Sequence, residues 1–225
     1  MKILITCEHG GNTIPNDLNR FLKIPELVLK SHRGFDPGSL ACAEYTAKHT
    51  KSFMVTNTIS RLVIDFNRST DNKELFSEFS SNLQEYHKQI LLGHYSEYRN
   101  KAEDFVKKSI RSKQEVIHFS FHTFVPELDG KIRDADIGIL YDNSQKQEKL
   151  IAENLRKALK AKDSELRVKM NYPYSGKSDG FTTYLRKVFP KNYSGIEIEY
   201  NQSLFGDKKR VKSITDTIKE FLNQT

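Results

Sequence analysis

Short apolar runs recur along the chain and alternate with longer segments in which apolar residues fall three or four positions apart. The short runs are rich in β-branched and aromatic residues, a composition typical of buried strands. The predicted strands are Lys2 to Cys7, Phe53 to Asn57, Leu62 to Phe66, Val116 to Phe121, Ile137 to Tyr141, Leu166 to Met170 and Gly195 to Tyr200.

The longer segments predict helices, because apolar side chains at this spacing form one face of a helix. The helices are predicted over residues 37–52, 77–110, 143–162 and 209–224. Pro37 stands near the first helix start, and Asn143 and Ser144 are candidate caps of the third helix. The predicted inward-facing positions are Leu40, Ala43, Tyr45, Ala47, Leu83, Tyr86, Ile90, His94, Tyr98, Ala102, Phe105, Ile110, Leu150, Leu155, Leu159, Val211, Ile214, Ile218 and Leu222.

Strands that alternate with helices of this length predict an α/β fold with three layers. The central sheet is expected to be largely parallel or mixed, with helices on both faces. Ligands bind such sheets at the carboxyl ends of the strands. Polar residues cluster at these strand ends, so the pattern already locates a candidate site.

Length and composition favour one domain over residues 1–225, because no Pro-, Gly- or Ser-rich linker interrupts the chain. The 14 Phe and 10 Tyr provide large apolar area for a core. No apolar run approaches the ~20 residues of a membrane helix. Only four apolar or neutral residues separate Lys2 from Cys7, so no signal peptide is expected. We therefore expect a soluble, cytoplasmic protein without a membrane partner.

The net charge of +7 raises the question of a nucleic-acid partner. The lysines are scattered on helix-like segments beside acidic residues, which favours a solvated surface over a phosphate-binding patch. No nucleic-acid partner is expected. The two cysteines, Cys7 and Cys42, imply no disulfide framework.

The first predicted strand ends on Cys7, Glu8 and His9, followed by two glycines. The glycines permit a tight turn and a close approach of a ligand to the backbone. A hydrogen-bonded histidine at a capped strand end is the structural alternative. A second candidate segment, SHRGFDPGSL, places His32 and Asp36 before a helix, where Asp36 is either a cap or an oxygen ligand of a metal.

The segment SRLVIDFNRS carries Arg61, Asp65, Asn67 and Arg68 around a short apolar run. Along a strand, Asp65 and Asn67 share one face. Two arginines and an amide suit recognition of a carboxylate, because a guanidinium group pairs with a carboxylate through two parallel hydrogen bonds. A salt bridge between Asp65 and Arg68 at the surface is the alternative.

Two further strands carry candidate groups at their carboxyl ends. His118 and His122 share one face of a strand, and His122 stands at its end, where an imidazole is a natural zinc ligand. His118 sits deeper, where a structural hydrogen bond is expected. Glu197 and Glu199 alternate with apolar residues, and a buried acid needs a cation or a cleft. At least one of them is therefore expected to face the crevice.

The segment NYPYSG, with Tyr174 and Gly176, has the composition of a loop that closes over a ligand. An ordinary connection between two elements is the alternative interpretation.

Taken in order, these segments resemble the N-formylglutamate amidohydrolase family. The matching stretches run from residue 6 to about residue 204, in the family's order, and SRLVIDFNR resembles the family most closely. They are CEHGGNTIP, GFDPGSLACA, SRLVIDFNRS, HTFVPELDG leading to IGILYD, NYPYSG and GIEIEYNQSL.

The resemblance implies a zinc-dependent hydrolase with a fold like that of carboxypeptidase-type exopeptidases, cleaving N-formyl-L-glutamate to formate and glutamate. It implies that His9, Asp36 and His122 bind the metal, either Zn²⁺ or another divalent transition metal. Glu199 would be the base and Arg61 the oxyanion stabiliser. Asn67 and Arg68 would hold the substrate carboxylate, with Tyr174 and Gly176 from the loop as further substrate contacts.

The chain departs from many relatives at Tyr200 to Ser203, where they have Arg and Asp after the final acid. A different acyl group or amino acid is therefore an open alternative, as are catalysis through Cys7 and a basic binding protein without a metal. The oligomeric state and the participation of Glu8, His32 and Glu197 also stay open.

Overall fold

The computed structural model describes residues 1–224, and its centre is a six-stranded sheet in the order β2-β1-β3-β8-β6-β7. A separate two-stranded hairpin, β4-β5, follows β3 in sequence. The strands are β1 (Lys2–Cys7), β2 (Phe53–Thr56), β3 (Val116–Phe124), β4 (Glu127–Leu128), β5 (Lys131–Ile132), β6 (Ile137–Leu140), β7 (Val168–Met170) and β8 (Tyr193–Asn201).

The sheet is mixed. Strands β2, β1, β3 and β8 are mutually parallel, so their carboxyl ends meet at one edge of the sheet. Strand β6 pairs antiparallel with β8 and parallel with β7. The α/β fold class with a mixed central sheet is confirmed.

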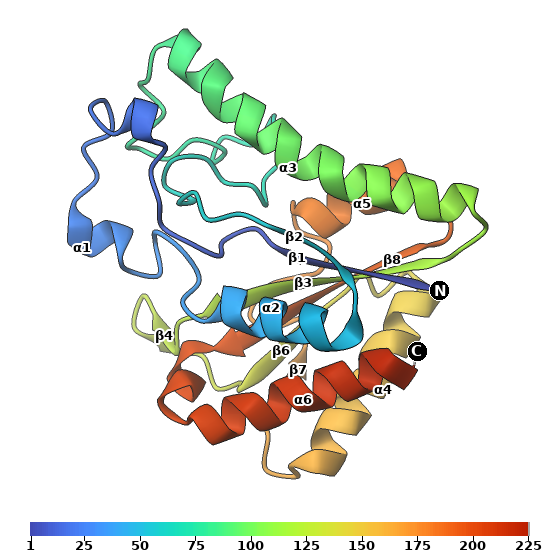
Figure 1. The fold of residues 1–225 in the computed structure, drawn as a ribbon. Coiled ribbons are helices and arrows are strands. Elements are labelled where there is room, and N and C mark those ends of the chain that lie inside the picture. Colours follow the sequence, from blue (N-terminus) through green and yellow to red (C-terminus); the bar gives the residue numbers. More distant parts are fainter. Residues whose placement is uncertain (225) are drawn as a thin grey trace.

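Helices cover both faces of the sheet (Figure 1). Helices α2, α4 and α6 pack on one face, and α3 and α5 pack on the other. None of the helices within residues 1–224 is both long and apolar enough to cross a membrane. The helices are η1 (Asn16–Leu18), α1 (Glu26–Leu29), α2 (Ser39–Thr50), α3 (Glu85–Arg111), α4 (Lys146–Lys162), α5 (Phe181–Val188), η2 (Gln202–Gly206) and α6 (Lys208–Gln224).

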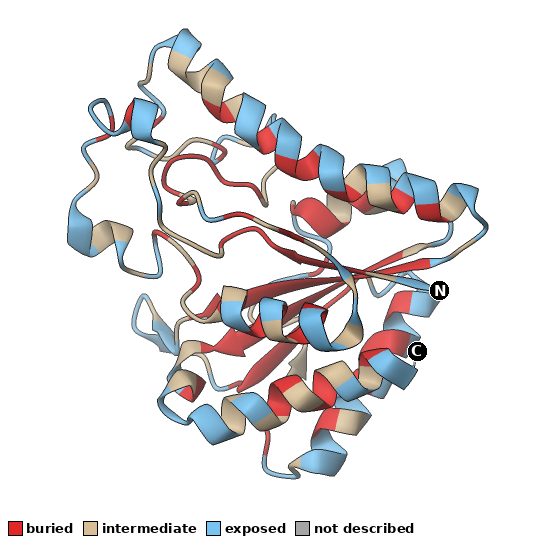
Figure 2. Cartoon of the chain, viewed as in Figure 1, coloured by how far each residue is buried: buried red, intermediate tan, exposed pale blue. Residues whose placement is uncertain are grey.

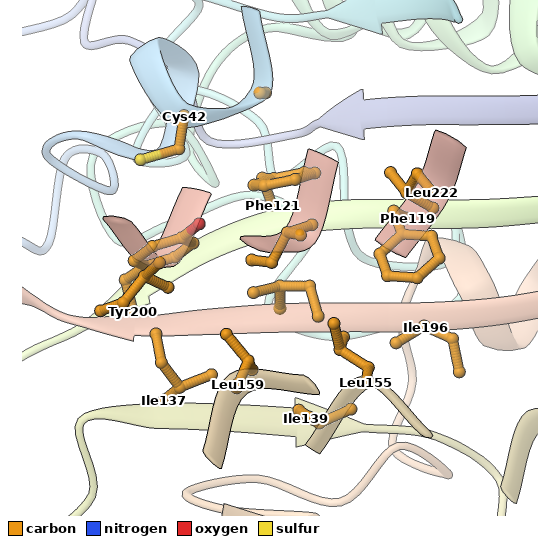
Figure 3. Packing of buried hydrophobic residues seen from close by; sticks show 14 of the residues in the cluster. Cys42, Phe119, Phe121, Ile137, Ile139, Leu155, Leu159, Ile196, Tyr200 and Leu222 are labelled. Carbon is orange, nitrogen blue, oxygen red and sulfur yellow. The ribbon is translucent and has the colours of Figure 1, made fainter. Parts of the chain in front are cut away.

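The core is divided by the sheet into two apolar clusters, and the strands between them are buried (Figure 2). On the α2, α4 and α6 face, Phe119 and Phe121 of β3 pair in register with Ile196 and Ile198 of β8 and share one apolar cluster with them. Figure 3 shows Phe119, Phe121 and Ile196 in this cluster. Alternation along the strands therefore turns the intervening residues of β3 and β8 toward the other face. Those residues include the polar groups at the carboxyl ends.

The strand predicted at Leu62 to Phe66 is wrong. The backbone turns there, since the Val63 N–H donates to the carbonyl of Ser60 at 2.9 Å and the Arg68 N–H to that of Asp65 at 3.1 Å. The apolar side chains of this segment are still buried, and those of Val63, Ile64 and Phe66 belong to the cluster beneath α3. A short apolar run indicates burial, but it does not distinguish a buried strand from a buried turn.

The helices predicted from residues 77 and 143 begin later than expected, and parts of their inward faces are wrong. Residues 77–84 form turns, and α3 begins at Glu85, so Tyr86 is 73% exposed and His94 is also exposed. Helix α4 begins at Lys146 without a side-chain cap, and Leu150 is 52% exposed because its neighbour Ile151 faces the core. The buried face of α3 consists of Leu91, Tyr95, Tyr98, Arg99, Ala102, Val106 and Ser109.

Candidate active site

The parallel strands bring histidines and acids from distant parts of the sequence to one edge of the sheet. His9 is the second residue after β1, and His122 lies near the end of β3, paired in register with Glu199 of β8. Asp36 precedes α2, and its N–H donates to the carbonyl of His9 at 2.9 Å. All four side chains are buried.

Three of these residues offer ligand atoms to one point. The side chains of His9, Asp36 and His122 present atoms that all lie within 4.8 Å of one another. Oδ2 of Asp36 lies 3.0 Å from Nδ1 of His122 and 3.5 Å from Nδ1 of His9. Asp36 is not a side-chain cap, since α2 begins after Gly38 and no side chain caps it.

The other nitrogen of each imidazole faces a second carboxylate. Nε2 of His9 lies 2.6 Å from Oδ1 of Asp65, and Nε2 of His122 lies 3.1 Å from Oε2 of Glu8. A carboxylate accepts the N–H of an imidazole, so in the neutral ring the opposite nitrogen has a free lone pair. Both histidines therefore direct Nδ1 toward Asp36.

Within residues 1–224, three buried polar atoms of this site have no hydrogen-bond partner: Nδ1 of His9, Nε of Arg68 and Oε2 of Glu199. A buried polar group without a partner costs free energy unless a ligand satisfies it. Two imidazoles and one carboxylate are the donor set of catalytic zinc sites, which leave a position open for water or substrate. The residues present therefore fit a divalent metal.

Burial and mutual contacts shift the protonation of the site. Burial would raise the pKa of Asp36 and of Asp65, but the nearby histidines, and Arg61 beside Asp65, hold both values well below the usual range. Burial raises the pKa of Glu199 to about 7. Glu199 is therefore poised near neutral pH, where a carboxylate both accepts and releases a proton.

A cavity of about 200 Å³ opens beside these groups. Arg61 and Arg68 supply cationic groups on its wall, and Asn67 supplies an amide. The cavity is lined by His9, Asp36, Arg61, Asn67, Arg68, His122, Thr123, Tyr174, Ser175, Ser178, Asp179, Glu197 and Glu199.

Hydrogen bonds hold the arginine-rich segment in place despite its irregular backbone. The Arg61 guanidinium contacts Asp65 Oδ2 at 3.2 Å and Asp36 Oδ1 at 3.5 Å. The Arg68 guanidinium donates to the Asp179 carbonyl at 2.9 Å, and its Nε lies 3.9 Å from Asp65 Oδ2. The Asn67 Oδ1 accepts from the backbone of α5, so its Nδ2 is the group left for the cavity.

Several predicted or open residues lie outside the cavity. Gly176 packs against the backbone of Tyr141, its N–H donates to Asn171 and its carbonyl accepts from Arg186, so its peptide groups are occupied and it does not line the cavity. His32 is exposed and is also not part of the lining.

The residues at which the chain departs from its relatives, Tyr200 to Ser203, lie outside the cavity as well. Tyr200 is buried in the opposite apolar cluster, and Asn201 binds the backbone carbonyls of Arg133 and Ala135. The departure therefore gives no direct reason to expect a different substrate.

Sequence reasoning missed the roles of Glu8 and Asp65 behind the histidines. The sequence offers Asp65 a surface salt bridge with Arg68 as one alternative, but its nearest partner is His9, at 2.6 Å. Glu197 lines the cavity and accepts from the Thr182 hydroxyl, and Asp179 contributes to the wall as well. The sequence does contain a signal for these two roles. Glu8 directly precedes His9, and Asp65 lies between Arg61 and Arg68.

The thiol of Cys7 is not placed for nucleophilic catalysis. It is fully buried in the cluster under α2, donates to the Ser39 hydroxyl at 3.2 Å, and burial raises its pKa to about 12. A thiol acts as a nucleophile only as the thiolate. His118 binds Thr6 and Tyr193 in the sheet, so its predicted structural role is confirmed.

Comparison with known proteins supports the family suggested by the sequence motifs. The sequence model of a family described as N-formylglutamate amidohydrolase matches residues 1–206. Among curated proteins, the sequence comparison finds no match.

Two crystal structures share the fold. A gene product from Agrobacterium tumefaciens superposes with a TM-score of 0.80 at 23% identity, covering 99% of this chain and 89% of that chain. An N-formylglutamate amidohydrolase from Ralstonia eutropha JMP134 superposes with a TM-score of 0.76 at 14% identity, covering 100% of this chain and 92% of that chain.

Proposed function

We infer the function from the premise that this chain belongs to the N-formylglutamate amidohydrolase family, whose model matches residues 1–206. The family supports amide hydrolysis as the activity. We propose that the protein is a zinc-dependent hydrolase of an N-acyl amino acid, with N-formyl-L-glutamate as the first substrate to test. Water would cleave the formyl amide of that substrate to give formate and glutamate.

His9 and His122 would hold the metal through Nδ1, together with a carboxylate oxygen of Asp36, because these atoms converge. When bound, zinc supplies a Lewis acid that lowers the pKa of water toward ~7 and polarises a carbonyl. Histidine and carboxylate ligands also accept manganese, cobalt or iron, so the metal needs direct measurement.

Glu199 would act as the general base. Its carboxylate lines the same cavity, and one of its oxygens has no protein partner within residues 1–224, so it is free to accept a proton from the attacking water. A neighbouring cation favours the ionised carboxylate, the form needed for this step. The protonated Glu199 would then donate to the nitrogen of the departing amine.

Arg61 would stabilise the negative charge that develops on the amide oxygen. Asp36 and Asp65 hold its guanidinium at the cavity wall before any substrate binds. A donor fixed in advance avoids reorganisation during the reaction, and one such donor is typically worth ~3 kcal/mol of barrier.

Arg68 and the Asn67 amide would bind a carboxylate of the substrate and align its amide with Glu199. Arg68 retains donors beyond its bond to the Asp179 carbonyl, and both side chains line the cavity. Tyr174, 46% exposed at the cavity rim, would cover the bound substrate from the 171–180 loop. Gly176 has no part in this proposal.

One observation carries the proposal: three ligand atoms from distant segments converge in the cavity that also contains Glu199.

The test combines elemental analysis of the purified protein with a substrate panel of N-formyl, N-acetyl and dipeptide compounds. We expect one equivalent of zinc and hydrolysis of N-formyl-L-glutamate. Hydrolysis of another acyl amino acid alone would correct the substrate and leave the reaction type intact. Absence of metal, together with salt-sensitive binding of nucleic acid, would instead support the non-enzymatic alternative.

A further inference from the structure

Glu8 is a buried carboxylate that the proposed reaction does not use. It follows β1, is inaccessible to solvent and lies behind His122 as seen from the cavity, since it does not belong to the cavity lining. Its Oε1 accepts from the Tyr98 hydroxyl of α3 at 2.7 Å, and its Oε2 accepts from the Ser120 hydroxyl of β3 at 2.5 Å. A buried carboxylate with several donors is costly to assemble, so its position calls for a function.

The Ser120 hydroxyl lies between Glu8 and His122. Its Oγ is 2.5 Å from Glu8 Oε2 and 2.9 Å from His122 Nε2. A hydroxyl has one proton, and a carboxylate accepts hydrogen bonds without donating any. Because Ser120 donates its proton to Glu8, it can only accept at His122.

The direction of this hydrogen bond fixes the proton on Nε2 of His122. Both neighbours of Nε2, the Ser120 oxygen and Oε2 of Glu8 at 3.1 Å, are acceptors. Nε2 therefore carries a proton, so in the neutral imidazole, the form that binds a metal, the lone pair lies on Nδ1, which faces Asp36. Without Glu8, the Ser120 hydroxyl could donate to Nε2, which would place the proton of a neutral imidazole on Nδ1 and prevent binding of a metal there.

We propose that Glu8 is a positioning residue for the metal site, acting through Ser120 and His122 to keep the Nδ1 atom of His122 available as a ligand. This inference rests on the proposed function, because it assumes that His122 binds a divalent metal. It adds a role for Glu8 that is distinct from that of Glu199: Glu8 contacts neither the cavity nor the reacting atoms.

The experiment measures zinc affinity of the purified full-length protein by competition with a chromophoric chelator, for the wild type, Glu8→Gln and Glu8→Ala. We expect Glu8→Ala to bind zinc about 10- to 100-fold more weakly, the usual effect of removing a partner behind a metal-binding histidine. Glu8→Gln keeps an oxygen acceptor near Ser120 and His122, so we expect it to retain part of this affinity. Glu148→Gln is the matched control.

Glu148 is also a fully buried carboxylate, but it binds Arg186 and two backbone N–H groups away from the ligand atoms. Its substitution tests for a general loss of stability, and we expect zinc affinity to be unchanged. A second readout is the Nε2–H signal of His122 in the zinc-loaded, ¹⁵N-labelled protein. This signal should be slow to exchange in the wild type and weakened in Glu8→Ala.

Wild-type zinc affinity in both Glu8 variants, with an unchanged Nε2–H signal, would overturn the positioning role and leave the proposed function intact. A wild-type protein that binds no zinc would overturn the proposed function itself. If Glu8→Ala does not fold, the zinc affinity of Glu8→Gln tests the positioning role instead, because this variant preserves the size of the buried side chain. Equal losses of affinity in Glu148→Gln and in the Glu8 variants would show an effect of stability alone.

Discussion

Strands β3 and β8 have two faces with different compositions, although the same backbone hydrogen bonds support both. One face presents Phe119 and Phe121 of β3 beside Ile196 and Ile198 of β8, all fully buried under α2, α4 and α6. The other face presents Ser120 and His122 beside Glu197 and Glu199, in register across the same two strands.

The apolar face of these strands stabilises the fold, whereas the polar face carries the groups of the proposed reaction. Removing the apolar face from water stabilises the fold by about 25 cal/mol for each Å² of apolar surface. The polar face has the opposite tendency, because buried histidines and acids lose hydration and depend on one another for compensation. Oε2 of Glu199 lacks even that compensation within residues 1–224, as expected of a group kept free for a reaction.

The largest effect on the polar face is expected from His122→Ala. This change removes a proposed ligand and leaves the Asp36 and Glu8 carboxylates without their shared partner. We expect bound zinc and hydrolysis to be lost together. Elemental analysis of the purified variant measures the first, and unchanged zinc content would show that the ligand assignment is wrong.

The next effect is expected from Glu199→Gln, which keeps the shape of the side chain but removes the base. Hydrolysis should fall by about 100- to 10,000-fold, the usual contribution of a general acid–base group, while zinc is retained. The free energy of unfolding should not decrease, because the change removes a buried, unpaired carboxylate oxygen. Turnover near the wild-type value would exclude Glu199 from the role of base.

On the apolar face, Phe121→Ala should act through stability. The side chain is fully buried beside Tyr200, so its removal leaves a cavity that costs about 3–5 kcal/mol. Urea unfolding measures this loss, and zinc content of the folded variant serves as the control. A loss of zinc in a variant that remains as stable as the wild type would contradict the division between the two faces.

The smallest effect is expected from Cys7→Ser. The thiol lies on the apolar side and donates only to Ser39, a bond that a serine hydroxyl can replace. Turnover should stay close to that of the wild type, with a modest decrease in the free energy of unfolding from a hydroxyl placed in an apolar cluster. Loss of turnover in a folded, zinc-containing variant would instead favour catalysis through the thiol.

Much of the fold was predictable from the sequence, because alternation and helical spacing are local signals. Six of the predicted strands and the main helices are present, and the alternation of Ile196, Glu197, Ile198 and Glu199 predicted which side chains face the core. The segment from Arg61 to Arg68 shows the limit of this reasoning. Its backbone was predicted incorrectly as a strand, yet Arg61 and Arg68 line the cavity because the buried apolar run between them holds both ends at the sheet edge.

By itself, the sequence determined the α/β class, the apolar face of the sheet and the residue types available for chemistry at the strand ends. These properties follow from the order of apolar and polar residues along the chain, which needs no knowledge of distant contacts. Only the tertiary structure decided that His9, Asp36 and His122 converge and that Glu8 and Asp65 lie behind the two histidines. The physical reason is that strand order and the path of irregular loops set which carboxylate meets which imidazole, and contacts over such sequence separations leave no local pattern.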